Sequence, residues 1–132
     1  MMYLLLLSSV LFFSAEIQDP ELKASIERGR DVYNDFCITC HLGNGEGSKG
    51  IIPPLAKSDY LLNNRKESIR AVKYGQQGKI KVNGVEYNGI MANQQLTVEE
   101  IADVMNYILN SWGNSGAKRV TEEEVRSVKN SD

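Results

Sequence analysis

The 132-residue sequence contains one histidine and two cysteines, so few of its side chains can bind a metal or act as a nucleophile. A structural zinc site needs four Cys or His ligands, and three residues cannot complete one. The formal net charge is only −2, and the chain has no basic tail, which argues against a nucleic acid as partner. The sequence also lacks internal repeats and low-complexity linkers, and its length fits one domain.

All three of these scarce residues lie in one pentapeptide, Cys37-Ile38-Thr39-Cys40-His41. The Cys-x-x-Cys-His spacing is that of a covalent c-type haem attachment site. Each cysteine sulfur can form a thioether with a haem vinyl group, and the histidine that follows can then ligate the iron. The sequence therefore predicts one haem c, bound covalently through Cys37 and Cys40, with His41 as an axial ligand.

Two other interpretations of the cysteine pair agree less well with the sequence. A thioredoxin-like motif lies at a strand-to-helix junction of a parallel α/β fold, and no alternating strand–helix pattern surrounds Cys37. A disulfide between Cys37 and Cys40 would close a small, strained ring and would therefore stabilise the fold little. Haem attachment is the interpretation that uses the histidine as well as both cysteines.

Residues 1–15 carry no charged side chain and contain the apolar runs 4–7 and 10–13. This length is typical of a signal peptide and is shorter than the about 20 residues of an ordinary membrane span. Because c-type haem is attached outside the cytoplasm in bacteria, we expect export to the periplasm. The alternative is a segment retained as an N-terminal anchor, since Phe13 is a poor residue two positions before Ala15 in a cleavage site.

Turn and capping residues divide the rest of the chain into a mainly helical domain with one hairpin. Asn83-Gly84 lies between two short alternating segments, which is the strongest short hairpin signal. Thr97 and Glu100 form a capping box that opens an amphipathic helix, which we expect to carry Trp112 on its apolar face and to end at Gly113. The predicted helices cover residues 20–36, 59–62, 66–74 and 98–112. The predicted domain covers residues 19–113, and a tail, 114–132, forms either a short helix or a frayed end.

A low-spin electron-transfer haem needs a second axial ligand, which can be His, Met, Lys or an amine terminus. Met1 and Met2 lie in the leader, and Met105 lies on the apolar face of the last helix, where methionine usually fills the core. Met91 lies in a loop that has no amphipathic reason to carry it, between the hairpin and the last helix. Elimination favours Met91 as the sixth ligand, which would raise the reduction potential. An exposed or packing methionine is the alternative.

Charge is unevenly distributed along the chain. Residues 49–81 contain eight basic and two acidic residues, whereas residues 1–48 contain three basic and seven acidic ones. Residues 99–132 contain four basic and seven acidic residues. Such an asymmetry can orient a redox partner during encounter, so the basic 49–81 region is a candidate docking guide. An ordinary solvated surface gives the same pattern and is the alternative interpretation.

Over roughly residues 22–113 the chain resembles the class I (mitochondrial-like) monohaem cytochromes c of bacteria. The resemblance implies an all-α cytochrome c fold, in which three main helices surround one covalent haem and a small β-hairpin precedes the loop of the axial methionine. It also implies that the first and last helices cross closely at a glycine. The features that carry it, besides the haem motif, are Gly29 and Tyr33, Val104 and Tyr107, Pro53-Pro54-Leu55, Tyr87-Asn88-Gly89-Ile90-Met91, and the stretch from Asn106 to Asn114.

The resemblance assigns roles to two further residues. The carbonyl of Pro53 would accept a hydrogen bond from Nδ1–H of His41, which fixes the imidazole tautomer and makes it a better ligand. Tyr87 would pack on the haem or donate a hydrogen bond beside it. Many relatives have proline directly after the ligand methionine, whereas this chain has Ala92, which removes a φ constraint from the loop.

The implied function is the transfer of one electron at a time between respiratory redox proteins in the periplasm, with no catalytic residue. A haem-based sensor or peroxidase-like catalyst is the alternative from another class. It needs an open iron site, which only Ala92 favours, and the chain has no second histidine for acid–base chemistry. A fixed cytochrome subunit of a larger oxidoreductase is a third hypothesis, in which residues 114–132 or a retained leader would contact the partner.

Overall fold

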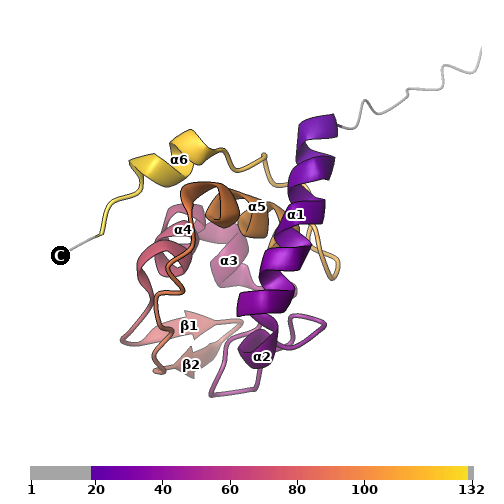
Figure 1. Cartoon of the computed structure of the whole chain (residues 1–132). Coiled ribbons are helices and arrows are strands. Elements are labelled where there is room, and N and C mark those ends of the chain that lie inside the picture. The colour runs from indigo at the N-terminus through magenta and orange to yellow at the C-terminus, as the bar shows by residue number, and fades with distance from the viewer. Residues whose placement is uncertain (1–18, 131–132) are drawn as a thin grey trace, which may run out of the picture.

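The computed structural model describes residues 19–130, which form a mainly helical molecule with one two-stranded sheet (Figure 1). The predicted all-α fold with a small hairpin is confirmed. The predicted leader, residues 1–15, lies outside the described residues. In chain order the elements are α1 (Pro20–Phe36), α2 (Ile38–His41), α3 (Asp59–Asn63), α4 (Arg65–Tyr74), β1 (Ile80–Val82), β2 (Val85–Tyr87), α5 (Val98–Ile108) and α6 (Glu122–Ser127).

Helix α1 begins where the sequence predicts. The Asp19 side chain accepts a hydrogen bond from the backbone N–H of Glu21 at 3.0 Å, and Pro20 occupies the first turn, where its missing N–H costs nothing. The buried residues of α1 are Ser25, Gly29 and Tyr33. Their spacing of four places them on one face of the helix, and this face packs against α5.

The two long helices cross at Gly29. A Cβ atom on this residue would overlap the carbonyl oxygen of Asp103 and would lie 2.9 Å from Cβ of Tyr107, so only glycine fits. The ring of Tyr33 packs on that of Tyr107, with centroids 5.3 Å apart. The predicted crossing partner Tyr107 therefore lies at the crossing. Val104 is also buried, and it lines the cavity described below.

Helix α5 has the predicted start but an earlier end. The backbone N–H of Glu100 donates to Oγ1 of Thr97 at 3.2 Å, and its carboxylate accepts from the N–H of Thr97 at 2.8 Å. The helix ends at Ile108, so the prediction that it runs to Gly113 is wrong. Trp112 adopts a φ of 54° and leaves the helical path.

The displaced Trp112 packs beside the end of the haem motif. Its ring centroid lies 5.1 Å from that of Tyr33, and its Nε1 donates to the carbonyl of Gly43 at 3.1 Å. The indole also covers Gly45, where a Cβ would lie 2.5 Å from the ring. A continued helix would lose these contacts, which explains why the chain turns after Ile108.

The hairpin forms as expected. Strands β1 and β2 are antiparallel, and Val82 pairs with Val85 across the turn. Asn83 and Gly84 have φ angles of 49° and 79°, the left-handed pair that a type I′ turn requires. Tyr87 and Val82 are both buried, so this face of the hairpin contributes to the core.

Helices α3 and α4 follow each other almost without a break. Oγ of Ser58 caps α3 by accepting from the N–H of Leu61 at 3.1 Å. Asn64 precedes α4, but its side chain donates to the carbonyl of Tyr60 instead of capping the helix. Within α4, Ile69 is completely buried, and the helix ends at Gly75, whose φ is 91°.

Residues after α5 pack on the same core. Thr121 caps α6 by accepting from the N–H of Glu124 at 3.2 Å. The side chains of Val120, Val125 and Val128 are at most 3% exposed and join the core cluster. The segment with α6 therefore packs on the helical body (Figure 1).

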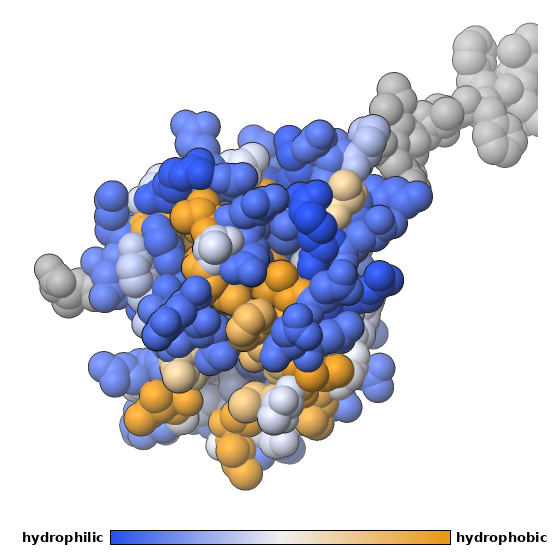
Figure 2. Space-filling view, in the orientation of Figure 1, coloured by the Kyte–Doolittle hydropathy of each residue, from blue (hydrophilic) through white to orange (hydrophobic). Residues whose placement is uncertain are grey.

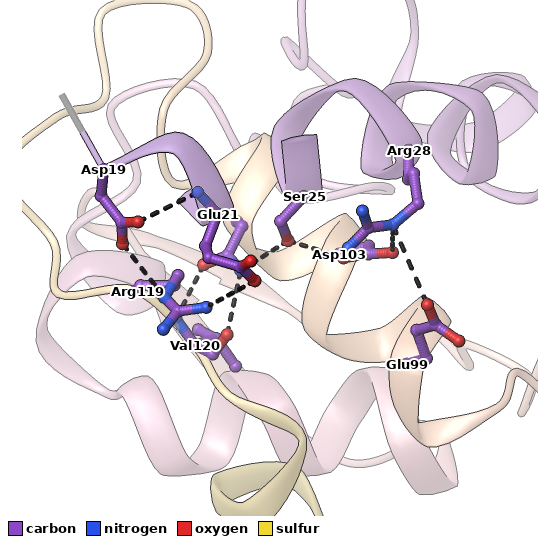
Figure 3. A network of polar contacts seen from close by, with 9 residues as sticks. Asp19, Glu21, Ser25, Arg28, Glu99, Asp103, Arg119 and Val120 are labelled. Carbon is purple, nitrogen blue, oxygen red and sulfur yellow. Dashed lines mark hydrogen bonds and ion pairs between the residues drawn. The ribbon is translucent and has the colours of Figure 1, made fainter. Parts of the chain in front are cut away.

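A polar network joins α1, α5 and this segment (Figure 3). Ser25 donates to the buried carboxylate of Asp103 at 2.6 Å, and Arg28 pairs with the same carboxylate at 2.7 and 2.9 Å. The amide of Asn106 exchanges two hydrogen bonds with the backbone of Val120, at 2.9 and 2.7 Å. The network therefore fixes the start of the tail against the helix crossing.

Within residues 19–130, none of the helices combines the length and the apolar character that a membrane span requires.

Candidate haem site

One cavity, of about 330 Å³, lies between α2, α4, the hairpin, the loop before α5, and α5 itself. Its wall is mainly apolar, and among residues 19–130 no Asp, Glu, Lys or Arg side chain lines it. All of the sequence-predicted site residues line this one cavity: Cys37, Cys40, His41, Pro53, Tyr87 and Met91.

The haem motif forms a single helical turn at the end of α1. The N–H of Cys37 donates to the carbonyl of Tyr33 at 2.9 Å, so this cysteine continues the path of α1. The N–H groups of Cys40 and His41 both donate to the carbonyl of Cys37, at 3.2 and 2.9 Å. Residues three and four positions apart on a helix share a face, which is why Cys37, Cys40 and His41 all reach the cavity.

His41 is buried, with an exposed fraction of 8%, and its Nδ1 lies 3.1 Å from the carbonyl oxygen of Pro53. Burial lowers the pKa of the imidazole, and the contact with Pro53 opposes this shift. The carbonyl can only accept, so Nδ1 carries the proton of a neutral ring and Nε2 remains free to ligate a metal. Neutral imidazole is the form that binds iron.

Cys37 does not have the electrostatics of a redox-active thiol. Burial, and to a smaller extent the neighbouring Cys40, raise the pKa of the Cys37 thiol to about 11. Thioredoxin-like motifs need the opposite, a thiol whose pKa is lowered so that the thiolate is available. A thioether carries no charge, so its formation agrees with the apolar surroundings of Cys37.

Met91 is held in the cavity wall by its backbone. Its N–H donates to the carbonyl of Gln76 at 2.8 Å, and its carbonyl accepts from the N–H of Gln76 at 2.9 Å. A Cβ on Gly75 would lie 2.7 Å from the carbonyl oxygen of Met91, so the two segments approach closely. Met105 lines the same cavity, but it is fully buried on α5 and belongs to the core cluster.

Sequence reasoning missed Ser68, which lines the cavity from α4. This residue is 6% exposed, and within the described chain its Oγ has no hydrogen-bond partner. An unsatisfied buried hydroxyl costs about 1–3 kcal/mol, so the cavity is expected to hold an occupant with a polar atom for it. The only sequence signal that Ser68 lines the cavity was its spacing of four from Val72, which places both residues on one face of α4.

The residues present fit a covalently bound haem. The apolar walls suit the macrocycle, both thiols line the cavity, and the imidazole of His41 offers a free nitrogen. The orphaned hydroxyl of Ser68 suits a polar atom of the same group.

Comparisons with known proteins agree with this fit. The sequence model of the family described as Cytochrome c matches residues 26–112. The chain is 41% identical over 102 residues to cytochrome c-552 of Thermus thermophilus, covering 70% of this chain and 78% of that protein. The same identity relates it to cytochrome c-552 of a second strain of T. thermophilus, of which it covers 69%.

More distant similarity extends to subunits of an enzyme. The chain is 26% identical over 115 residues to the cytochrome c subunit of alcohol dehydrogenase (quinone) from Gluconacetobacter polyoxogenes. This match covers 76% of the chain but 22% of that subunit. The family match and the identity to the two c-552 proteins lead to one conclusion: the chain belongs to the class I monohaem cytochromes c and carries one haem c, bound covalently through Cys37 and Cys40.

Proposed function

We propose that this cytochrome c is a periplasmic electron carrier of a respiratory chain, in which His41 and Met91 ligate the haem iron. Membership of the family makes the chain a haem electron carrier. The observation that supports the ligand pair is the cavity that brings together His41 of α2 and Met91 of the loop before α5. The bound haem supplies a one-electron change between ferric and ferrous iron.

The protein keeps this change outer-sphere. The contact with Pro53 holds the His41 ring in one orientation, and the backbone pairing with Gln76 holds Met91. If His41 and Met91 both hold the iron, no coordination position would remain for a substrate. The mainly apolar wall would favour the less charged ferrous state of a bound haem.

A pair of matched variants tests the ligand assignment. We expect Met91→Leu to lower the reduction potential, because the thioether that favours ferrous iron is lost, and to allow carbon monoxide to bind the reduced protein. Met105→Leu conserves volume and should leave the visible spectrum low-spin and indifferent to the gas. A Met91→Leu protein with the spectrum of the wild type would overturn the assignment, as would a Met105→Leu protein that binds carbon monoxide.

Electron exchange is proposed to occur at the apolar mouth of the cavity. Phe36, Ile51 and Ile90 line the cavity and are 44%, 69% and 82% exposed. Apolar side chains gather at the lower end of the molecule, where α2 and the hairpin lie (Figure 2). Exposed apolar groups beside a cofactor favour a partner that covers them. Ile51→Asn, which adds no charge beside the cavity, should slow electron transfer to a partner, and an unchanged transfer rate would contradict this role of the mouth.

The basic 49–81 region contributes less free charge than its sequence suggests. Four of its eight basic side chains make internal contacts: Arg65 with Glu124, Arg70 with Glu67, Lys79 with Glu86, and Lys73 with backbone carbonyls. Electrostatic guidance of a partner is therefore proposed to come from the four other exposed lysines, Lys49, Lys57, Lys66 and Lys81. A transfer rate that does not change with ionic strength would contradict this guidance.

Export is part of the proposal, with residues 1–15 as its signal. Fractionation of cells that make the full chain should place the haem-containing protein in the periplasm, either free or attached to the membrane by an uncleaved leader. Haem-containing protein in the cytoplasm would contradict the proposal.

A fixed subunit of an oxidoreductase is the second candidate. It is favoured by the similarity to cytochrome c subunits of alcohol dehydrogenase (quinone), although the chain spans only 22% of their length. The chemistry would be the same, with a permanent partner in place of transient ones. Size-exclusion chromatography of native extract, followed by the haem absorbance, separates a free carrier from a large complex.

A further inference from the structure

We propose that the C-terminal segment, residues 114–130, positions the axial ligand Met91 by holding the last turn of α4. In this arrangement Lys73 and Tyr74 are positioning residues, which act on the iron through the backbone of Gly75 and Gln76. The inference rests on the proposed ligation of the iron by Met91.

The link from α4 to Met91 is short and made of backbone. Gln76 follows α4 by two residues and exchanges both of its backbone hydrogen bonds with Met91, at 2.9 and 2.8 Å. Gly75, the residue between α4 and Gln76, approaches the Met91 carbonyl so closely that a Cβ on it would lie 2.7 Å from the carbonyl oxygen. A shift in the last turn of α4 must therefore move Met91.

The last turn of α4 is itself held by the C-terminal segment. The ammonium of Lys73 donates to the carbonyls of Val125 and Val128, at 2.7 and 2.9 Å, and the hydroxyl of Tyr74 donates to the Val128 carbonyl at 3.2 Å. A cation that bridges two carbonyls makes stronger hydrogen bonds than a neutral donor. At the other end of α4, Arg65 pairs with Glu124 of α6 at 2.6 and 2.8 Å.

The carbonyls that accept these hydrogen bonds belong to residues that are anchored in the core. The side chain of Val125 is completely buried and that of Val128 is 3% exposed, so both residues are anchored in the core. The segment is anchored again at Val120, whose backbone is paired in both directions with the side chain of Asn106 on α5. The segment therefore transmits the position of α5 to the end of α4.

The hydrogen bonds of Lys73 and Tyr74 to the C-terminal segment form a brace that acts only on the last turn of α4. Ile69 is completely buried and keeps the middle of α4 in the core without help from Lys73. Loss of the Lys73 and Tyr74 contacts should therefore loosen the last turn of α4 while the domain stays folded. It should also loosen the backbone pairing of Gln76 with Met91, which we call the clasp. The loop that carries Met91 continues with Ala92, which imposes no φ constraint of its own. The position of Met91 therefore depends on the clasp.

The test compares Lys73→Met with Tyr74→Phe in one protein against Arg119→Gln. Arg119 belongs to the same segment but pairs with Asp19 at 3.2 Å and with Glu21 at 3.6 Å, both at the start of α1 (Figure 3). Two readouts are taken on the oxidised holoprotein: the affinity of the iron for added imidazole, from the visible spectrum, and the hydrogen exchange of the Gln76 and Met91 amides.

In the double variant we expect imidazole affinity to rise about tenfold, because charged hydrogen bonds that hold the clasp are lost, and the two amides to exchange faster. Arg119→Gln should match the wild type in both readouts. A double variant that also matches the wild type would overturn the brace. A wild type whose reduced form already binds carbon monoxide would instead overturn the ligation by Met91 on which the inference rests.

Discussion

The Nδ1 atom of His41 lies 3.1 Å from the carbonyl oxygen of Pro53. A proton donated to this carbonyl makes the opposite nitrogen, Nε2, a stronger donor to iron and so favours the ferric state. The direction of the carbonyl depends on Pro54, because the residue before a proline is restricted in its backbone angles. Two prolines in sequence would thus set the properties of His41 as the proposed axial ligand.

Replacing Pro54 by alanine should therefore raise the reduction potential. The variant keeps the Pro53 carbonyl but frees its direction, so the hydrogen bond to His41 weakens. The rise should be at most on the order of 40 mV, because one ordinary hydrogen bond contributes about 1 kcal/mol. Potentiometry measures the shift, and NMR should show faster exchange of the His41 Nδ1 proton. A lower potential, or a proton as protected as in the wild type, would contradict this role.

A methyl group at the helix crossing should be costly. Gly29→Ala places Cβ against the carbonyl of Asp103, and a backbone atom cannot rotate away. The helices must separate, so we expect a loss of about 2–3 kcal/mol in the free energy of unfolding. Gly43→Ala is the control, since a Cβ there meets nothing within 4 Å. Guanidinium denaturation compares the two, and equal stabilities would refute the close crossing.

The ion pair between Asp103 and Arg28 joins one buried and one exposed side chain. The Asp103 side chain is 6% exposed, whereas that of Arg28 is 53% exposed. Arg28→Met leaves a buried anion with only the Ser25 hydroxyl, and we expect a loss of about 2–3 kcal/mol. Asp103→Asn leaves a cation that water can solvate, and should cost about 1 kcal/mol.

The same series contains its control, Arg30→Met. Arg30 pairs with Asp31 at 3.9 Å between side chains that are 59% and 77% exposed, and such pairs contribute about 0–1 kcal/mol. Thermal unfolding followed by far-ultraviolet circular dichroism ranks the three variants. If Asp103→Asn were the most destabilising of them, the assignment of the cost to the buried anion would be wrong.

Stability should depend on pH through Glu124. The hydrogen bond from Arg65 holds the pKa of this carboxyl below its ordinary value of 4.5. A carboxyl whose pKa is lower in the folded state stabilises the fold above its unfolded pKa, and this contribution is lost as the pH falls through the folded pKa. Glu124→Gln should therefore be about 1 kcal/mol less stable than the wild type at pH 7, with the difference shrinking below pH 4.5. A difference that persists at pH 2 would contradict this linkage.

Local signals in the sequence predicted most of the elements. Asn83-Gly84 forms the expected turn because its left-handed φ angles are a property of those two residues alone. The capping box of Thr97 and Glu100 likewise needs only a spacing of three. The haem motif also depends on local spacing, since one helical turn brings both cysteines and His41 to the cavity.

Features that depend on distant contacts were not predictable in this way. The apolar spacing of α5 continues to Trp112, but the chain turns at Ile108 because the indole packs on Tyr33 and Gly45, which the helical pattern does not encode. The pairing of Gln76 with Met91 joins two backbones and leaves no side-chain signature. Half of the basic side chains in residues 49–81 contact other groups of the same chain. These contacts were not predictable because the sequence does not show which partners the fold brings near.

The central claim is that both axial positions of the iron are filled by the protein, one by His41 and one by Met91. It is tested most directly by the visible spectrum of the exported protein, oxidised and reduced, with carbon monoxide then added to the reduced form. We predict a low-spin c-type spectrum that the gas leaves unchanged. A spectrum that shifts with carbon monoxide would mean that Met91 is absent from the iron or easily displaced, and would contradict a dedicated electron carrier.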